Sequence, residues 1–192
     1  NHVQMPNGFG LMGHFSTTQS AVIIQKPGSA TIYYIFTVDQ GAWPNGIRYT
    51  EVDMLLNAGN GDVTANKNIP LFTPSCEKIT GIRHCNNKDV WVVTHDWNSN
   101  AFRTYLVTAA GVNTIAVVSN AGLAVSVSAG NTVGQLKGSP DGTKLASAIH
   151  SPINRFELFD FDNSTGIVSN TNAILFPQFA ASSGAYGIEF SP

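Results

Sequence analysis

The sequence predicts an all-β fold, and three observations support that prediction. Short apolar segments alternate with turn sequences along nearly the whole chain, which is typical of strands joined by tight connections. The 3.6-residue apolar periodicity of amphipathic helices is essentially absent. Similar phrases also recur at intervals of about 53 residues, which indicates an internal repeat.

The repeat is visible in several landmarks. A glycine with similar neighbours occurs in "TGIRH", "VGQLK" and "YGIEF", at Gly81, Gly134 and Gly187. Turn sequences at 86–89 and 139–142 keep the same spacing. One arginine opens the third segment of each copy, and these residues are Arg48, Arg103 and Arg155.

The best-defined copy contains four predicted strands. They are "NTVGQLKG" (131–138), "TKLASAIH" (143–150), "RFELFDFD" (155–162) and "IVSNTNAIL" (167–175). The first turn, "SPDG", combines the fixed φ of Pro140, the local bonding of Asp141 and the permissive backbone of Gly142. The two earlier copies repeat this order, with a fourth strand predicted at 61–69 in the first copy and at 112–119 in the second.

Repeats of four antiparallel strands predict a partial β-propeller. Its blades span roughly 17–72, 77–120 and 131–176, and the first strand of another blade starts at 185–192. Several middle strands, such as "DVWVV", are apolar on both faces, as expected for sheets covered on both sides. A β-sandwich is the alternative fold, but it does not explain the repeat. Because propellers close with four to eight blades, we expect a fragment of a larger ring, about seven-bladed, with further blades before and after it.

Several long phrases carry a family resemblance. They include "CEKITGIRHC", "VVTHDWNSNAF", "SPDGTKLASAIH" and "RFELFDFDNSTGIVSN". Together they resemble the propeller region of large secreted proteins of Bacteroidota that end in gliding-motility-associated or type IX secretion sorting domains. The resemblance implies an extracellular or cell-surface location and a role in adhesion. It supplies no catalytic residue.

Composition limits the partners that can be expected. Charged residues make up 11% of the chain and the formal net charge is −2, which argues against nucleic-acid binding. No apolar stretch is long enough to cross a bilayer, so no membrane insertion is expected. Cys76 and Cys85 flank a predicted strand that would separate them by about 25–30 Å, so they are interpreted as buried thiols, with a disulfide to a cysteine elsewhere in the protein as the alternative.

The loops between second and third strands are the candidate ligand site. By the family geometry they share one rim of the ring, and aromatic faces with amides and carboxylates suit a glycan. Their candidate ligand-binding residues are Trp43, His95, Asp96, Trp97, Asn98 and His150. The alternative is that the tryptophans pack between blades and the polar groups satisfy turn backbone.

Asp160 and Asp162 in "DFDNSTG" are weak candidates for calcium ligands, because calcium takes several closely spaced oxygens. The pattern has no terminal glutamate, so an Asx-type turn with Gly166 at positive φ is the main interpretation. Calcium is therefore only a weak cofactor prediction, and no other cofactor is expected.

The remaining polar residues are interpreted as structural. His84 could face a central channel, where a lone histidine is usually not a metal ligand. The recurring arginines are expected to pack their stems and form hydrogen bonds, with a shared anion site as the alternative.

No nucleophile elbow or phosphate-binding loop occurs in the sequence. A non-enzymatic module that binds glycan or surface protein is therefore the preferred function. A propeller hydrolase, lactonase or lyase and a purely structural spacer are the alternatives.

Overall fold

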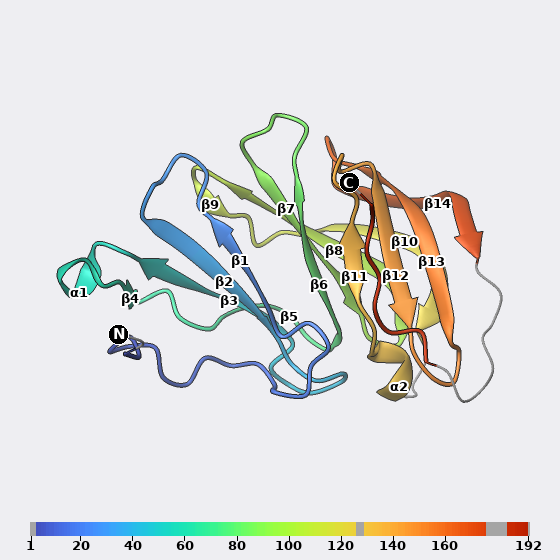
Figure 1. The fold of residues 1–192 in the computed structure, drawn as a ribbon, viewed down its shortest axis with the longest axis horizontal. Coiled ribbons are helices and arrows are strands. Elements are labelled where there is room, and N and C mark those ends of the chain that lie inside the picture. The colour runs from blue at the N-terminus through green and yellow to red at the C-terminus, as the bar shows by residue number, and fades with distance from the viewer. Residues whose placement is uncertain (1–2, 126–128, 176–183, 192) are drawn as a thin grey trace.

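The computed structural model describes residues 3–125, 129–175 and 184–191, which form three antiparallel sheets lying side by side (Figure 1). The all-β prediction is confirmed, and the strands of each sheet follow one another in chain order. In the described part of the chain, neither helix is long or apolar enough to cross a membrane.

The first sheet has the order β1-β2-β3-β4, and β5 also pairs with β3. Its strands are β1 (Ala21–Gln25), β2 (Ile32–Val38), β3 (Ile47–Asp53), β4 (Asp62–Val63) and β5 (Ile69–Phe72). The single fourth strand predicted at 61–69 is therefore wrong, because two short strands share the edge of β3. The connection contains α1 (Leu56–Gly59), a tight turn in which Asn57 and Ala58 have positive φ.

The second sheet has the order β6-β7-β8-β10, and the short β9 also pairs with β8. Its strands are β6 (Ser75–Arg83), β7 (Val90–Asp96), β8 (Ser99–Thr108), β9 (Gly111–Val112) and β10 (Val117–Val125). The fourth strand predicted at 112–119 is again divided into two strands along one edge.

The third sheet has the order β11-β12-β13-β14 and follows the short helix α2 (Ala129–Thr132). Its strands are β11 (Leu136–Gly138), β12 (Lys144–Ile149), β13 (Arg155–Asp162) and β14 (Ile167–Leu175). The strand predicted from residue 131 begins late, because Gly134 has a φ of +110° that interrupts the extended chain.

The three sheets share one register. In each sheet the residue after the first strand donates its N–H across the first turn, in the pairs Lys26–Ile32, His84–Asp89 and Ser139–Lys144. The carbonyl acceptor of each bond lies at or directly before the start of the second strand. Five residues further along the chain, a residue of the second strand pairs with one of the recurring arginines of the third strand. These pairs are Thr37–Arg48, Thr94–Arg103 and Ile149–Arg155. The arginines therefore occupy equivalent positions, as the sequence pattern predicted.

The glycine landmarks are not equivalent. Gly81 lies three residues before His84, whereas Gly134 lies five residues before Ser139 (84 − 81 and 139 − 134). The predicted match of these two glycines is therefore wrong by two residues. Gly187 lies beside the start of the third sheet, where the Gln135 N–H donates to the Tyr186 carbonyl at 2.9 Å.

The second sheet is buried on both faces. One apolar cluster, which includes Phe36 and Val92, joins it to the first sheet. Another cluster, which includes Trp91 and Phe159, joins it to the third sheet. Adjacent residues of β7 thus point into different cores, which is why this strand does not alternate between apolar and polar residues.

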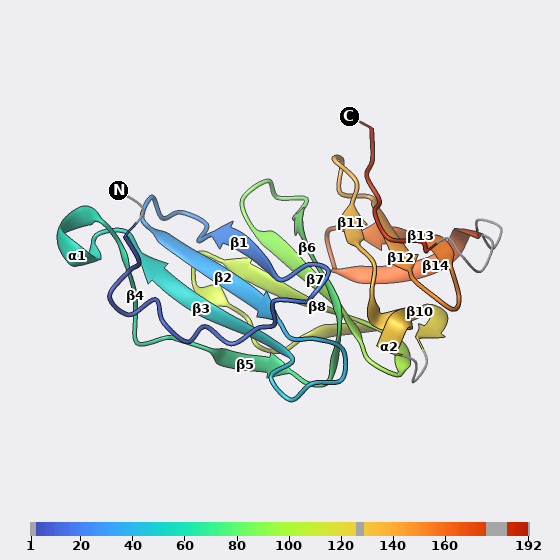
Figure 2. The same cartoon turned by 60° about the horizontal axis from the view of Figure 1, so that its bottom comes forward.

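The first strands β1, β6 and β11 lie next to one another (Figures 1 and 2). The turns at 26–31, 84–89 and 139–143 gather at one end of the sheets, which we call the turn end. The loops at 39–46, 97–98 and 150–154 gather at the opposite end, which we call the loop end.

Candidate binding site at the loop end

Trp43 is the most accessible candidate residue with an aromatic side chain. Its side chain is 51% exposed, and the His14 ring lies beside it with a centroid separation of 4.9 Å. The Trp43 carbonyl accepts a bond of 3.4 Å from the Thr73 hydroxyl. An indole face is thus presented to solvent next to a polar ring.

The loop that carries Trp43 is ordered by a buried carboxylate. Asp39 accepts hydrogen bonds from the backbone N–H groups of Gln40 and Asn45, each at 2.9 Å. The loop closes at Gly46, whose φ is +56° and where a Cβ would lie 2.1 Å from the Phe72 carbonyl oxygen. These contacts fix the position of Trp43 before any ligand arrives.

Trp97 and Trp43 both contact the same short segment, at Pro74 and Thr73 respectively. The backbone N–H of Trp97 donates to the Pro74 carbonyl at 3.3 Å, next to the Thr73 hydroxyl that contacts Trp43. The Trp97 indole nitrogen is buried and has no hydrogen-bond partner among the described residues. Asn98 is exposed and takes a φ of 55° in the tight turn. The structure therefore brings three of the candidate residues into one region.

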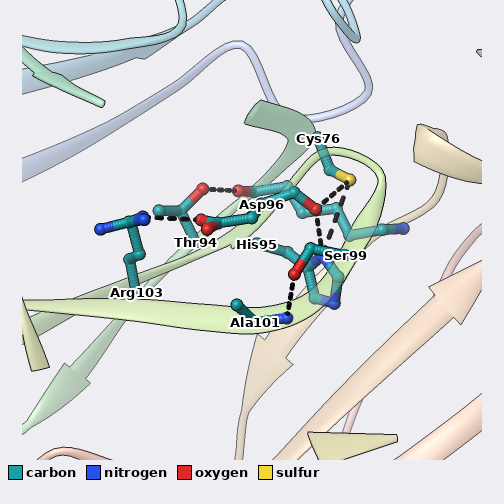
Figure 3. Close-up of polar contacts among 8 residues, drawn as sticks. Cys76, Thr94, His95, Asp96, Ser99, Ala101 and Arg103 are labelled. Atoms are coloured by element: carbon teal, nitrogen blue, oxygen red, sulfur yellow. Dashed lines mark hydrogen bonds and ion pairs between the residues drawn. The ribbon is translucent and has the colours of Figure 1, made fainter. Parts of the chain in front are cut away.

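His95 and Asp96 point into the interior (Figure 3). Asp96 accepts a bond of 2.8 Å from Arg103, and the guanidinium of Arg103 lies 3.6 Å from the centre of the Phe72 ring in the first sheet. His95 stacks edge-on against Phe102. Both side chains are thus buried, and the Asp96 carboxylate is paired within the protein.

Cys76, His95 and Asp96 form a cluster that resembles a catalytic arrangement (Figure 3). The Asp96 carbonyl can only accept, so the His95 Nδ1 at 2.7 Å carries the proton and donates it. The Nδ1 therefore cannot take a proton from the Cys76 thiol 3.6 Å away. Burial raises the pKa of the thiol to about 12 and lowers the pKa of the imidazole to about 4. The thiol and the imidazole are therefore neutral, hydrogen-bonded groups of the core.

The two remaining candidate histidines each contact another aromatic ring. His150 packs edge-on against Tyr186 at the third sheet. His84 stacks on the Trp91 ring, which places it against the second sheet and not in a channel. Both cysteines are free thiols, and the expected burial is correct for Cys76 but wrong for the exposed Cys85.

The recurring arginines use local partners. Arg48 donates to the carbonyls of Asn45 and Asn68, and Arg155 lies 3.7 Å from the Glu157 carboxylate. With the Asp96 contact of Arg103, each guanidinium has an acceptor in its own sheet. These contacts support the packing interpretation over a shared anion site.

Asp160 and Asp162 both use their carboxylates within the protein. Asp160 forms an ion pair with Lys144. Asp162 accepts bonds from the N–H and hydroxyl of Ser164 at 2.9 and 2.6 Å, which lower its pKa to about 2. Gly166 has a φ of +77° in this turn, as the Asx-turn interpretation predicted. Among the described residues, no group of three or more His, Cys, Asp or Glu could hold a metal.

We expect calcium to leave the thermal stability unchanged, because Asp160 is paired with Lys144 and Asp162 is bonded within its own turn. Thermal unfolding followed with millimolar calcium and then with excess chelator should give the same melting temperature. Magnesium at the same ionic strength is the control for general salt effects. A calcium-specific rise in melting temperature would restore the calcium prediction.

The sequence interpretation missed a polar network between the first strands. Glu77 and Lys78 are adjacent and almost completely buried, because neighbouring residues of β6 point to opposite covered faces. The Glu77 carboxylate accepts from the Thr18 and Gly41 N–H groups of the first sheet and the segment before it. Two adjacent charged residues in the first half of a strand were the available signal.

Lys78 joins the second sheet to the third. Its Nζ donates to the Val133 carbonyl at 3.0 Å, to the Gly134 carbonyl at 2.8 Å and to the Ala148 carbonyl. Burial lowers the pKa of this ammonium to about 8. The Gln19 amide adds a further link by bonding the backbone of Ile79 and Leu136.

Comparisons of the chain with protein-family models, curated proteins and solved structures found no match. What can be said of the protein's class therefore comes from its own architecture, which is an all-β array of repeated antiparallel sheets.

Proposed function

We propose that the three sheets are blades of a β-propeller of about seven blades, and that the chain is a non-enzymatic binding module of a secreted or cell-surface protein. The shared register of the sheets and the adjacent first strands support the propeller. The Asn-rich, charge-poor composition and the resemblance to Bacteroidota surface proteins of the type IX secretion class support the extracellular part of the proposal.

The outer face of the first sheet supports a continuing ring. Apolar side chains there line an open cavity of about 330 Å³, and they are Met5, Ile23, Tyr33, Ile35, Val52 and Met54. In a propeller this face would pack against a neighbouring blade, as the second sheet packs on both its sides.

The observation that carries the binding proposal is the exposed, pre-positioned indole of Trp43. An exposed aromatic face stacks on the apolar face of a sugar ring, and nearby polar groups supply hydrogen bonds. The buried Trp97 N–H without a partner lies in the same region and could donate to a ligand after a small movement. A glycan is the ligand class that we propose for the loop end.

An enzymatic function draws no support from the Cys–His pairs. The His95 Nδ1 already donates its proton, as described above. At the turn end, the His84 Nδ1 accepts the Asn86 N–H at 3.0 Å, so its lone pair is engaged although Cys85 lies 3.5 Å away. Among the residues that the structure describes, neither thiol has a base with a free lone pair positioned to activate it.

Replacing Trp43 with alanine is expected to abolish glycan binding with little loss of stability, because half of the side chain is exposed. A glycan array followed by calorimetry with the best ligand measures the first effect, and thermal unfolding measures the second. Ile115→Ala removes another exposed apolar side chain, outside the loops named above, and should bind normally. A W43A protein that binds as well as the parent would contradict the proposal, as would a W43A protein that no longer folds.

A further inference from the structure

Three cationic side chains have no partner among the described residues, and all three line one cleft. The sequence contains 10 Lys and Arg residues. Hydrogen bonds or ion pairs hold Arg48, Lys67, Lys78, Arg103, Lys137, Lys144 and Arg155. Within residues 3–125, 129–175 and 184–191, the side chains that remain without such a contact are Lys26, Arg83 and Lys88.

The cleft lies at the turn end, between the first and second sheets. Its walls are the turn after β1, with Lys26, Pro27 and Gly28, and the turn after β6, with Asn87 and Lys88. Its volume is about 370 Å³, which falls within the range of small-molecule sites. The two turns that form its walls lie at the end of the sheets opposite the loop end (Figure 1).

The charge of the cleft is strongly positive for a protein with a net charge of −2. Asp89 is the acidic residue among the lining side chains, and its carboxylate accepts from the Asn86 amide at 2.7 Å. Three unpaired cations therefore outnumber a single, already bonded carboxylate. Concentrating unpaired cations in one concave site favours an anionic ligand.

The lining also limits the chemical class of the anion. No aromatic side chain lines the cleft, so it offers no stacking platform for a nucleobase. The amides of Gln25 and Asn87 can bond hydroxyl groups, and Ile23 and Pro27 offer apolar contact. Hydroxyls, a small apolar face and negative charge occur together in an acidic sugar.

We propose that this cleft binds an acidic oligosaccharide, with its sulfate or carboxylate groups held by Lys26, Arg83 and Lys88. Arg83 is the central residue, because it also lines the neighbouring cavity beyond the turn that follows β6. The planar guanidinium can bind a sulfate or carboxylate with two parallel hydrogen bonds. The proposal is independent of Trp43, since the two sites lie at opposite ends of the sheets.

The test is calorimetric titration with a sulfated heparin disaccharide and with the same disaccharide after desulfation. The sulfated form is expected to bind, more weakly as salt is raised, and the desulfated form at least about tenfold more weakly. Arg83→Gln should weaken binding about tenfold, and the triple variant K26Q/R83Q/K88Q should abolish it. Lys67→Gln makes the same charge change at a residue outside the cleft and should bind like the parent.

The remaining outcomes overturn the proposal. Equal binding by the triple variant and the parent would exclude the cleft, and equal weakening by K67Q would show non-specific charge attraction. Inorganic sulfate that competes as well as the disaccharide would assign the cleft to a free inorganic anion. An acidic peptide of equal charge that binds more tightly would assign it to a protein partner. Thermal unfolding of each variant confirms that the fold is retained.

Discussion

Alanine at Lys78 is expected to destabilise the fold by about 3–5 kcal/mol, because buried acceptors lose their donor and a large buried side chain is removed. The Val133, Gly134 and Ala148 carbonyls would lose their shared donor. The space of a fully buried side chain would also be left empty. Urea unfolding followed by tryptophan fluorescence measures this change.

Two further variants separate the causes of that loss. Lys78→Met fills most of the volume but donates no hydrogen bond, so it should recover only part of the lost stability. Lys88→Ala removes an exposed lysine and should change the free energy of unfolding by less than about 0.5 kcal/mol. If K78A unfolded at the same urea concentration as the parent, the link between the second and third sheets would lie elsewhere.

The strand pattern could be predicted because it depends on local signals. Turn sequences such as "SPDG" and "NSTG" mark strand ends through the backbone preferences of a few residues. Glycine at 142 and 166 has a positive φ in the structure, as those turns require. The arginines were readable from their recurrence near the start of each third segment, and in the structure each pairs with the equivalent position of the second strand.

The prediction that Gly81 and Gly134 are equivalent failed because similar flanking residues do not fix the position of a glycine within its strand. Gly81 lies inside β6 and pairs with Val92, whereas Gly134 interrupts the chain before β11. A register shift between Ser75 and Ile79 adds residues at the start of β6 that the third sheet lacks. Irregularities of this kind depend on contacts between sheets, which a single sequence does not display.

The burial of His95 and Asp96 in the candidate site could not be predicted from the sequence either. His95 and Asp96 are the last two residues of β7 and precede a turn, where polar residues are usually exposed. Their burial results from the sheet that covers the second face of β7 and from the reach of Arg103 toward Phe72. The exposure of Trp43 likewise depends on how Asp39 folds its loop back.

Acidification should destabilise the protein through His95. Its folded-state pKa is about 4, whereas the value in the unfolded chain is near 6.5. Between these values the unfolded chain binds a proton that the folded protein does not, so stability falls as the pH drops from about 6.5 to 4. The difference corresponds to about 3 kcal/mol over that window.

His95→Asn isolates this contribution, because the asparagine amide can still donate to the Asp96 carbonyl but does not titrate. The variant should be less stable near neutral pH, yet lose less stability than the parent between pH 6.5 and 4 in urea unfolding. Burial raises the pKa of Asp96, which opposes acid destabilisation, but this acts in both proteins and cancels in the comparison.

Phe102→Leu loosens the packing against His95 without removing it and should lower stability while keeping the parent's dependence of stability on pH. Parallel pH profiles for H95N and the parent would mean that His95 takes up its proton in the folded protein, and that the region around Cys76 is open to water.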